Sequence, residues 1–222
     1  MTEDKPLSAS ERFTVGLILK LNTMVTGELH PAHTAEEFVR VMGVRGFFRY
    51  LGFLNKFNKM MHDAFGPANT QTLVGLAALM AGCGYCGYGH TLTGALMTFK
   101  ANGQLHPVHP FSISQLFELE DHEVIEKLDE LLAQPGYEDL RRQTSHMYAI
   151  FLGDLEPETE EDKLLKAILD FWRWTVECTI VEGINMTPEN ARIMNEIGRD
   201  KTLRTRYEAA RAVERDAATL LH

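Results

Sequence analysis

Apolar residues recur at helical spacing along almost the whole chain, and no segment shows the alternation of a half-buried strand. A helix is expected over about residues 10–24, with one apolar stripe made of Phe13, Leu17, Leu21 and Met24. Of the 222 residues, 45% are hydrophobic, which is ample for a buried core. The pattern therefore predicts an all-α chain that folds as a compact multi-helix bundle.

Turn and capping signals divide the rest of the chain into further helices. Thr34-Ala-Glu-Glu37 is a capping box before a short helix, and Gly66-Pro67-Ala68-Asn69 ends the helix expected after it, over about residues 44–64. Thr70 is a candidate cap for the apolar helix that follows. The later helices are expected over about residues 114–134, 137–152, 159–184, 188–198 and 200–221.

No low-complexity linker interrupts this series. We therefore expect one domain over residues 1–222, with motif-bearing helices at about 70–101. A C-terminal helical extension is expected over about residues 156–222.

Two of the three cysteines and a histidine lie close together in the segment Cys83-Gly84-Tyr85-Cys86-Gly87-Tyr88-Gly89-His90. Gly82 can end the preceding helix, which places Cys83 near the start of the next one, where the helix dipole lowers a thiol pKa. Each helical residue advances about 100°, so Cys83, Cys86 and His90 share one face. One sulfur can attack, the other can close a disulfide, and the imidazole can move the proton.

Three glycines, Gly84, Gly87 and Gly89, lie inside this motif. Each costs about 1 kcal/mol relative to alanine in a helix interior. Close approach of a neighbouring helix, or of a substrate, beside the thiols would explain their presence.

The net charge of -9, from 31 acidic and 22 basic residues, disfavours binding to nucleic acid or to an anionic membrane. No run reaches the ~18 apolar residues of a membrane span. The segment Met1-Thr-Glu-Asp-Lys-Pro6 lacks the basic and apolar regions of a signal peptide. We expect a cytoplasmic protein, and in that reducing compartment a close cysteine pair is more often catalytic or metal-binding than structural.

The pattern Cys-x-x-Cys-x-x-x-His after an apolar helix resembles the alkyl hydroperoxidase D-like proteins of the carboxymuconolactone decarboxylase superfamily. The resemblance covers Cys83, Cys86, His90 and the helices that flank them. It implies that Cys86 attacks a peroxide, that Cys83 resolves the product as a disulfide, and that His90 activates Cys86. It also implies a homo-oligomer, commonly a trimer or hexamer, with no bound cofactor or metal. The reductant would be an external dithiol, such as a lipoyl protein or a thioredoxin-like donor.

Two positions differ from the family pattern. The best-known members have a glutamate about a dozen residues before the first cysteine, where this chain has Gln71, which can hold a hydrogen bond but takes no proton. Some members have a histidine directly before the second cysteine, where this chain has Tyr85, a poor base at neutral pH. Gln71 and Tyr85 are therefore supporting candidates, and Asp63 and Glu118 are acids that the fold could bring near.

The predicted function is a thiol-dependent oxidoreductase that reduces a peroxide or a disulfide through a Cys83/Cys86 cycle. A first alternative is a metal-binding or redox-sensing protein, because Cys83, Cys86 and His90 supply three of the four ligands of a closed zinc site. A second is a decarboxylase-like or isomerase-like member of the same superfamily, although that chemistry has no need for two thiols. The third cysteine, Cys178, lies in an apolar helix and is expected to be an inert buried thiol.

Overall fold

A computed structural model describes residues 6–30, 32–179 and 187–219 of this chain. Every regular element in these ranges is helical, which confirms the all-α prediction. The α-helices are α1 (Ala9–Thr26), α2 (Ala32–Phe65), α3 (Pro67–Met80), α4 (Gly84–Asn102), α5 (Pro110–Ser114), α6 (Asp121–Leu131), α7 (Glu138–Leu152), α8 (Glu160–Thr179) and α9 (Lys201–Thr219). Short 3₁₀ turns are η1 (Gln115–Glu118), η2 (Pro188–Asn190) and η3 (Glu196–Arg199).

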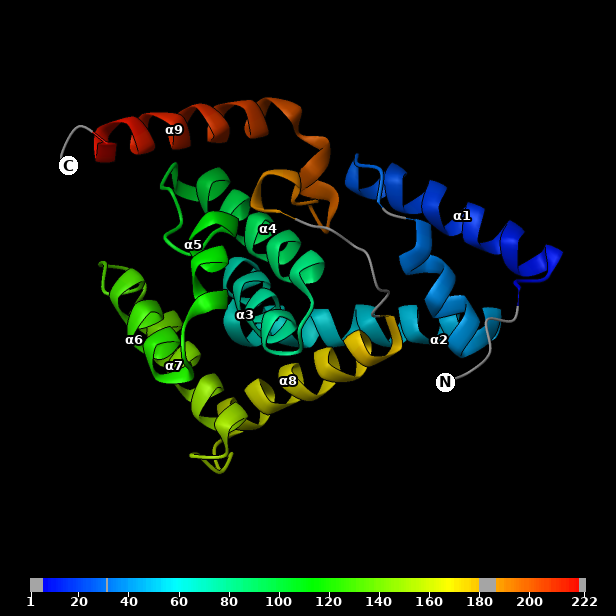
Figure 1. Ribbon diagram of the computed structural model, residues 1–222, viewed down its shortest axis with the longest axis horizontal. Coiled ribbons are helices and arrows are strands. Elements are labelled where there is room, and N and C mark those ends of the chain that lie inside the picture. The colour runs from blue at the N-terminus through cyan, green and yellow to red at the C-terminus, as the bar shows by residue number, and fades with distance from the viewer. Residues whose placement is uncertain (1–5, 31, 180–186, 220–222) are drawn as a thin grey trace.

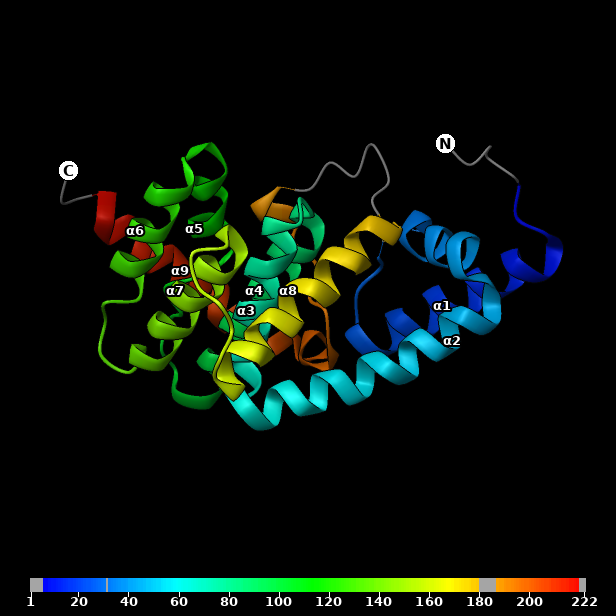
Figure 2. The same ribbon diagram turned by 90° about the horizontal axis from the view of Figure 1, so that it is seen from below.

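The helices are arranged around a central pair, α3 and α4. Figure 1 shows α8 along one side of this pair and α9 along the other, with α6 and α7 at one end of the molecule and α1 at the opposite end. Seen from below, α2 runs along one long face, from the end where α1 lies to the start of α3 (Figure 2). None of the helices in the described ranges is long and apolar enough to cross a membrane.

Helix α3 lies in the interior and is buried along most of its length. Its side chains Leu73, Val74 and Leu76 are at most 1% exposed, which explains why the segment is apolar on all sides. The chain turns at Gly66, whose φ of 77° is left-handed, and the helix begins at Pro67. Thr70 therefore does not cap α3; its hydroxyl donates to the carbonyl of Met61 at 3.0 Å.

Three expected helices differ from the observed ones. Two helices were expected where α2 stands, and Gly43, with a φ of 67°, kinks α2 between them. The first part begins at Ala32, so Thr34 lies inside the helix and does not precede it as a cap. The expected helix over 114–134 is instead α5, η1 and α6, because Leu119 and Glu120 are extended and the Glu123 carboxylate accepts the Glu120 N–H at 2.9 Å. These local hydrogen bonds replace a continuous helical ladder.

The expected helix over 188–198 is likewise two short turns, η2 and η3, joined by a non-helical segment. Backbone N–H groups of this segment are bound by side chains from elsewhere. Ile193 donates to the Glu28 carboxylate at 2.7 Å, and Met194 donates to the Thr93 hydroxyl at 2.9 Å. Long-range partners therefore override the local helical pattern.

The apolar stripe of α1 faces solvent in the single chain. Phe13 is 74% exposed, and the stripe continues through Leu17, Leu21 and Met24, all exposed. The helix packs through its other face, on which Val15 and Thr26 are buried. An exposed stripe of large apolar side chains is typical of a surface that another molecule covers.

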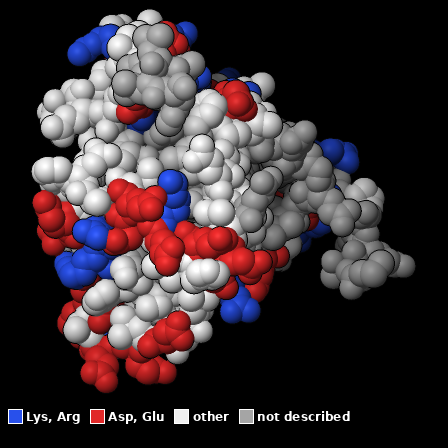
Figure 3. All heavy atoms as spheres, turned by 60° about the vertical axis from the view of Figure 1, so that its left-hand side comes forward, with Lys and Arg blue, Asp and Glu red and all other residues white. Residues whose placement is uncertain are grey.

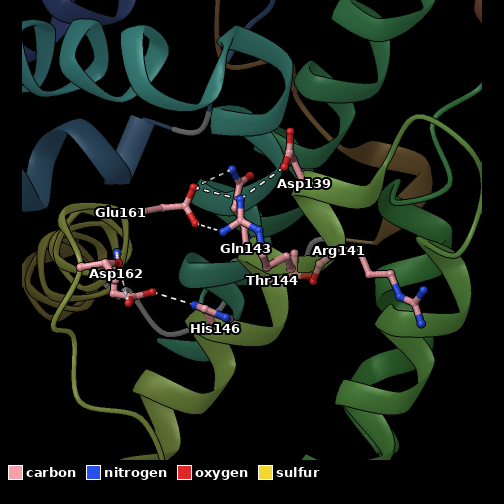
Figure 4. A network of polar contacts seen from close by, with 9 residues as sticks. Asp139, Arg141, Gln143, Thr144, His146, Glu161 and Asp162 are labelled. Carbon is pink, nitrogen blue, oxygen red and sulfur yellow. Dashed lines mark hydrogen bonds and ion pairs between the residues drawn. The ribbon is translucent and has the colours of Figure 1, made fainter.

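A polar network joins α7 to the start of α8, at a distance from the cysteine motif in sequence. Arg142 pairs with Asp139 and Glu161, and His146 Nδ1 lies 2.7 Å from Asp162 Oδ1. Figure 4 shows the His146 side chain of α7 pointing toward Asp162 of α8. The Thr159 hydroxyl donates to Asp162, and this hydrogen bond, with that from His146, lowers the Asp162 pKa. The network ties the first turn of α8 to α7.

Acidic side chains gather on the face drawn in Figure 3, on the side of the molecule where α6 and α7 lie. Helix α6 contributes exposed acids there: Asp121, Glu123, Glu126 and Glu130. Acidic side chains repel a polyanion at such a face, and the expectation of no nucleic-acid partner stays a prediction.

Candidate dithiol site

The turn between α3 and α4 places Cys83 at the first position before α4. Gly82, with a φ of 89°, lets the chain reverse, and the Cys83 N–H donates to the Ala78 carbonyl at 2.9 Å. Cys83 itself is extended and caps the helix, because its Sγ accepts the Cys86 N–H at 3.3 Å. The thiol of Cys83 therefore meets the positive end of the α4 dipole, as the position of Gly82 predicts.

The two thiols are in direct contact. The Sγ atoms of Cys83 and Cys86 lie 3.0 Å apart, and both cysteines are free and partly buried. This separation exceeds the roughly 2.05 Å of a disulfide bond, so the pair is a dithiol. Only a small movement is needed to join the sulfurs.

The hydrogen bond between the thiols divides their acidity unequally. The hydrogen bond between the two thiols lowers the pKa of Cys83, and the N–H groups of Cys86 and Tyr85 lower it further against the effect of burial. The pKa of Cys86 is raised well above its usual value, first by its hydrogen bond with Cys83 and then by burial. The first thiolate therefore forms on Cys83.

His90 follows Cys86 by one helical turn and is held by Gln71. His90 Nδ1 lies 2.7 Å from Gln71 Oε1, and since an amide oxygen only accepts, Nδ1 carries the hydrogen and Nε2 is left as an acceptor. The His90 ring meets Trp172 edge to face, with centroids 4.7 Å apart. Burial lowers the His90 pKa to about 3, so the imidazole is neutral at neutral pH.

Tyr85, between the two cysteines, is hydrogen-bonded to a histidine that the motif does not contain. Its hydroxyl meets His30 Nδ1, and His30 Nε2 lies 3.2 Å from the Thr26 hydroxyl. The Thr26 hydroxyl in turn donates to the Asn22 carbonyl at 2.9 Å. His30 is 5% exposed and comes from the short connection between α1 and α2.

A buried acid, Glu28, lies beside this histidine. One Glu28 oxygen accepts the Ile193 N–H at 2.7 Å, and the other pairs with Arg204 of α9. Burial is the larger effect on His30 and lowers its pKa, while the Glu28 charge raises it. Glu28 therefore ties the α1–α2 connection to the C-terminal part of the chain and adds a negative charge near the dithiol.

Sequence reasoning missed both His30 and Glu28. Neither stands in a recognisable motif, and the partners of Glu28 are 165 and 176 residues further along the chain. No local spacing could have signalled them.

Of the two further acids that the sequence offers, Asp63 does not join the site. Asp63 pairs with Lys59 on an exposed face of α2, at 2.6 Å. The side chains of Glu118 and Cys178 are outside the described part of the structure, so the prediction of an inert Cys178 stays a prediction. In that described part, no three His, Cys, Asp or Glu side chains are grouped so that they could hold a metal ion.

The glycines of the motif allow close approach at two of three positions. A Cβ on Gly87 would lie 2.4 Å from Leu79 of α3, and a Cβ on Gly89 would lie 2.6 Å from the Arg192 carbonyl. A Cβ on Gly84 would meet only Tyr88, at an ordinary 3.7 Å. Gly87 and Gly89 thus bring α3 and the segment before η3 against the backbone of α4.

Comparison of the chain with protein-family models, with curated proteins and with solved structures finds no match. The interpretation of the site therefore depends on its own geometry.

Proposed function

We propose that this protein is a thiol-dependent oxidoreductase that reduces a peroxide or a disulfide by cycling Cys83 and Cys86 between dithiol and disulfide. The observation that carries the proposal is the contact of two free thiols, 3.0 Å apart, at the start of α4. A helix N-terminus stabilises the attacking thiolate, and a second thiol within reach closes the disulfide.

The unequal acidity of the two cysteines supports Cys83 as the attacking sulfur. With a disulfide substrate, Cys83 would bond to one substrate sulfur while the other leaves as a thiolate. Cys86 would then attack the Cys83 sulfur, forming the protein disulfide and releasing the second substrate thiol. With a peroxide, Cys83 would take one oxygen as a sulfenic acid, and Cys86 would condense with it and release water. This order reverses the roles that the family resemblance implies, in which Cys86 attacks.

The same proposal includes an alkyl hydroperoxidase D-like homo-oligomer, placed in the cytoplasm and reduced by an external dithiol. The exposed apolar stripe of α1 supports assembly, because a stripe of this kind is seldom left uncovered. Cys83 is only partly buried, which supports reduction by a small or protein-bound dithiol.

Cysteine variants test the proposal and assign the roles. Turnover of a peroxide and of a small disulfide is measured with a dithiol donor for the wild type, Cys83→Ser, Cys86→Ser and, as a control, Cys178→Ser. We expect loss of turnover in both motif variants, no loss in the control, and a trapped mixed disulfide at Cys83 in Cys86→Ser. A mixed disulfide found only in Cys83→Ser would return the attacking role to Cys86. Equal turnover in all four proteins would refute the dithiol cycle.

A further inference from the structure

The resolving step of the proposed cycle needs a base. Cys86 must lose its thiol proton before it attacks the sulfur of Cys83. In the free dithiol the hydrogen bond with Cys83 and then burial raise the Cys86 pKa, and the burial remains once Cys83 carries the substrate sulfur or oxygen. A thiol in this state reacts slowly unless a nearby group takes the proton.

His90 is poorly suited to keep such a proton. Its only described hydrogen-bond partner is the neutral amide of Gln71. Burial lowers its pKa to about 3, and the neighbouring His30 lowers it in the same direction. In the described part of the chain, no carboxylate charge acts on the His90 ring to stabilise an imidazolium.

His30 has the acid partner that His90 lacks. The charge of Glu28 favours the protonated form of His30, while Arg192 opposes it. The other titratable groups facing this space are His90, Tyr85, Cys83 and Cys86. Arg204 is paired with Glu28 and holds it in place.

Tyr85 lies between His30 and the thiols. In the series of hydrogen bonds from Tyr85 through His30 and Thr26 to Asn22, each group donates to the next. The Thr26 hydroxyl donates to Asn22, so it accepts from His30 Nε2, and His30 Nδ1 therefore accepts from the Tyr85 hydroxyl. The Tyr85 oxygen is left able to accept a hydrogen. Tyr85 stands between Cys83 and Cys86 in the first turn of α4, and its side chain is buried. Burial, and then the charges of Cys86 and Cys83, raise the Tyr85 pKa, so its hydroxyl stays neutral.

We propose that Tyr85, His30 and Glu28 form the proton relay that deprotonates Cys86 in the resolving step, a role that rests on the proposed dithiol cycle. The Cys86 S–H bond breaks and its proton passes to the Tyr85 oxygen, directly or through one water molecule. The original Tyr85 hydrogen passes to His30 Nδ1, which leaves a Cys86 thiolate, a neutral Tyr85 and an imidazolium beside the Glu28 carboxylate. The thiolate keeps its electron pair and attacks Cys83. The family pattern has a glutamate where this chain has Gln71. In the proposed relay Glu28, from the connection between α1 and α2, takes the place of that acid.

The test separates attack from resolution in a single experiment. An aromatic disulfide that releases a coloured thiolate is mixed with the protein in a Cys178→Ser background. The first burst of colour reports attack by Cys83, and the second reports attack by Cys86 on the mixed disulfide. The rates of both phases are measured against pH for Tyr85→Phe, His30→Gln and Glu28→Gln. Matched controls are Tyr148→Phe and His62→Gln, which remove the same groups elsewhere, and His90→Asn, which removes the rival base.

We expect the three relay variants to slow the second phase at neutral pH by about tenfold or more, as loss of a general base does. Their second phase should recover at high pH, where hydroxide removes the proton, and their first phase should change much less. Glu28→Gln keeps a side-chain oxygen that can accept the Ile193 N–H. This variant therefore decides the test if another variant fails to fold. A second phase that is slowed by His90→Asn but not by the relay variants would overturn the relay. If the wild type itself releases no second burst, the dithiol cycle fails rather than the relay.

Discussion

His90 Nδ1 lies 2.7 Å from Gln71 Oε1, so a neutral amide occupies the place beside this imidazole where a carboxylate would hold a proton. The amide fixes the ring and its tautomer without giving it charge. The structure thus joins the two residues, although Gln71 stands nineteen positions before His90 and on a different helix.

Replacing Gln71 by glutamate should change His90 from a neutral group into a titrating one. A carboxylate at this place would favour the imidazolium and raise the His90 pKa from about 3 towards its usual value. Because Gln71 is buried, the added charge should also reduce the free energy of unfolding at neutral pH, by about 1–3 kcal/mol. Proton NMR titration of the His90 ring checks the first effect, with Gln71→Glu/His90→Asn to assign the signal. An unchanged His90 pKa would show that the two side chains do not interact in solution.

Acidification should destabilise the fold through His106. Its side chain is fully buried, and burial lowers its pKa to about 4. The folded state therefore binds fewer protons than the unfolded state between about pH 4 and 6.5, so stability is complete above this window and is lost as the pH falls through it. His106 alone should cost about 2 kcal/mol between pH 7 and pH 5.

Denaturant unfolding at the two pH values measures this loss. The control is His106→Asn, which offers an acceptor to the Val108 N–H as Nδ1 does but does not titrate. Its stability should fall less on acidification than that of the wild type. An equal fall in both proteins would assign the pH dependence to other groups, among them His90 and His109, whose pKa values are also lowered to about 3.

Gly75→Ala should destabilise the protein because α3 and α4 are too close to admit a methyl group. A Cβ on Gly75 would lie 2.6 Å from the Thr91 side chain and 3.0 Å from the Gly87 carbonyl, which cannot move without α4. We expect a loss of about 1–3 kcal/mol in the free energy of unfolding, as in other overpacked cores. Gly52→Ala is the matched control, since nothing lies within 4 Å of its Cβ, and it should gain about 0.5–1 kcal/mol. Equal effects of the two changes would mean that the helices are not in close contact.

Polar substitution of the α1 stripe should weaken self-association. Leu17→Ser/Leu21→Ser removes two exposed apolar side chains, so the fold of the single chain should be little affected. Sedimentation should show a smaller species than the wild type at equal concentration, with unchanged helical content by circular dichroism. Lys20→Ser, on the same helix, is the control. A monomeric wild type would contradict the assembly itself.

Regular helices could be predicted wherever apolar spacing and a terminating glycine coincide. The end of α3 near Gly82 and the position of Cys83 at the start of α4 are as expected, because a left-handed glycine conformation is encoded locally. The segment over 188–198 was predicted wrongly, because Glu28 and Thr93 bind its N–H groups and compete with the helix. The apolar stripe of α1 could be located from the sequence, but not the fact that the single chain leaves it exposed.

By itself, the sequence determined the all-helical fold and the contact of two thiols at a helix start, since these depend on residues within one or two turns of each other. It could not determine which thiol ionises first, because that depends on the contact between the two sulfurs, on burial and on the backbone N–H groups around Cys83. Only the tertiary structure brought Glu28 and His30 to Tyr85, and Arg204 to Glu28. Those charges act across space rather than along the chain, so no spacing in the sequence records them.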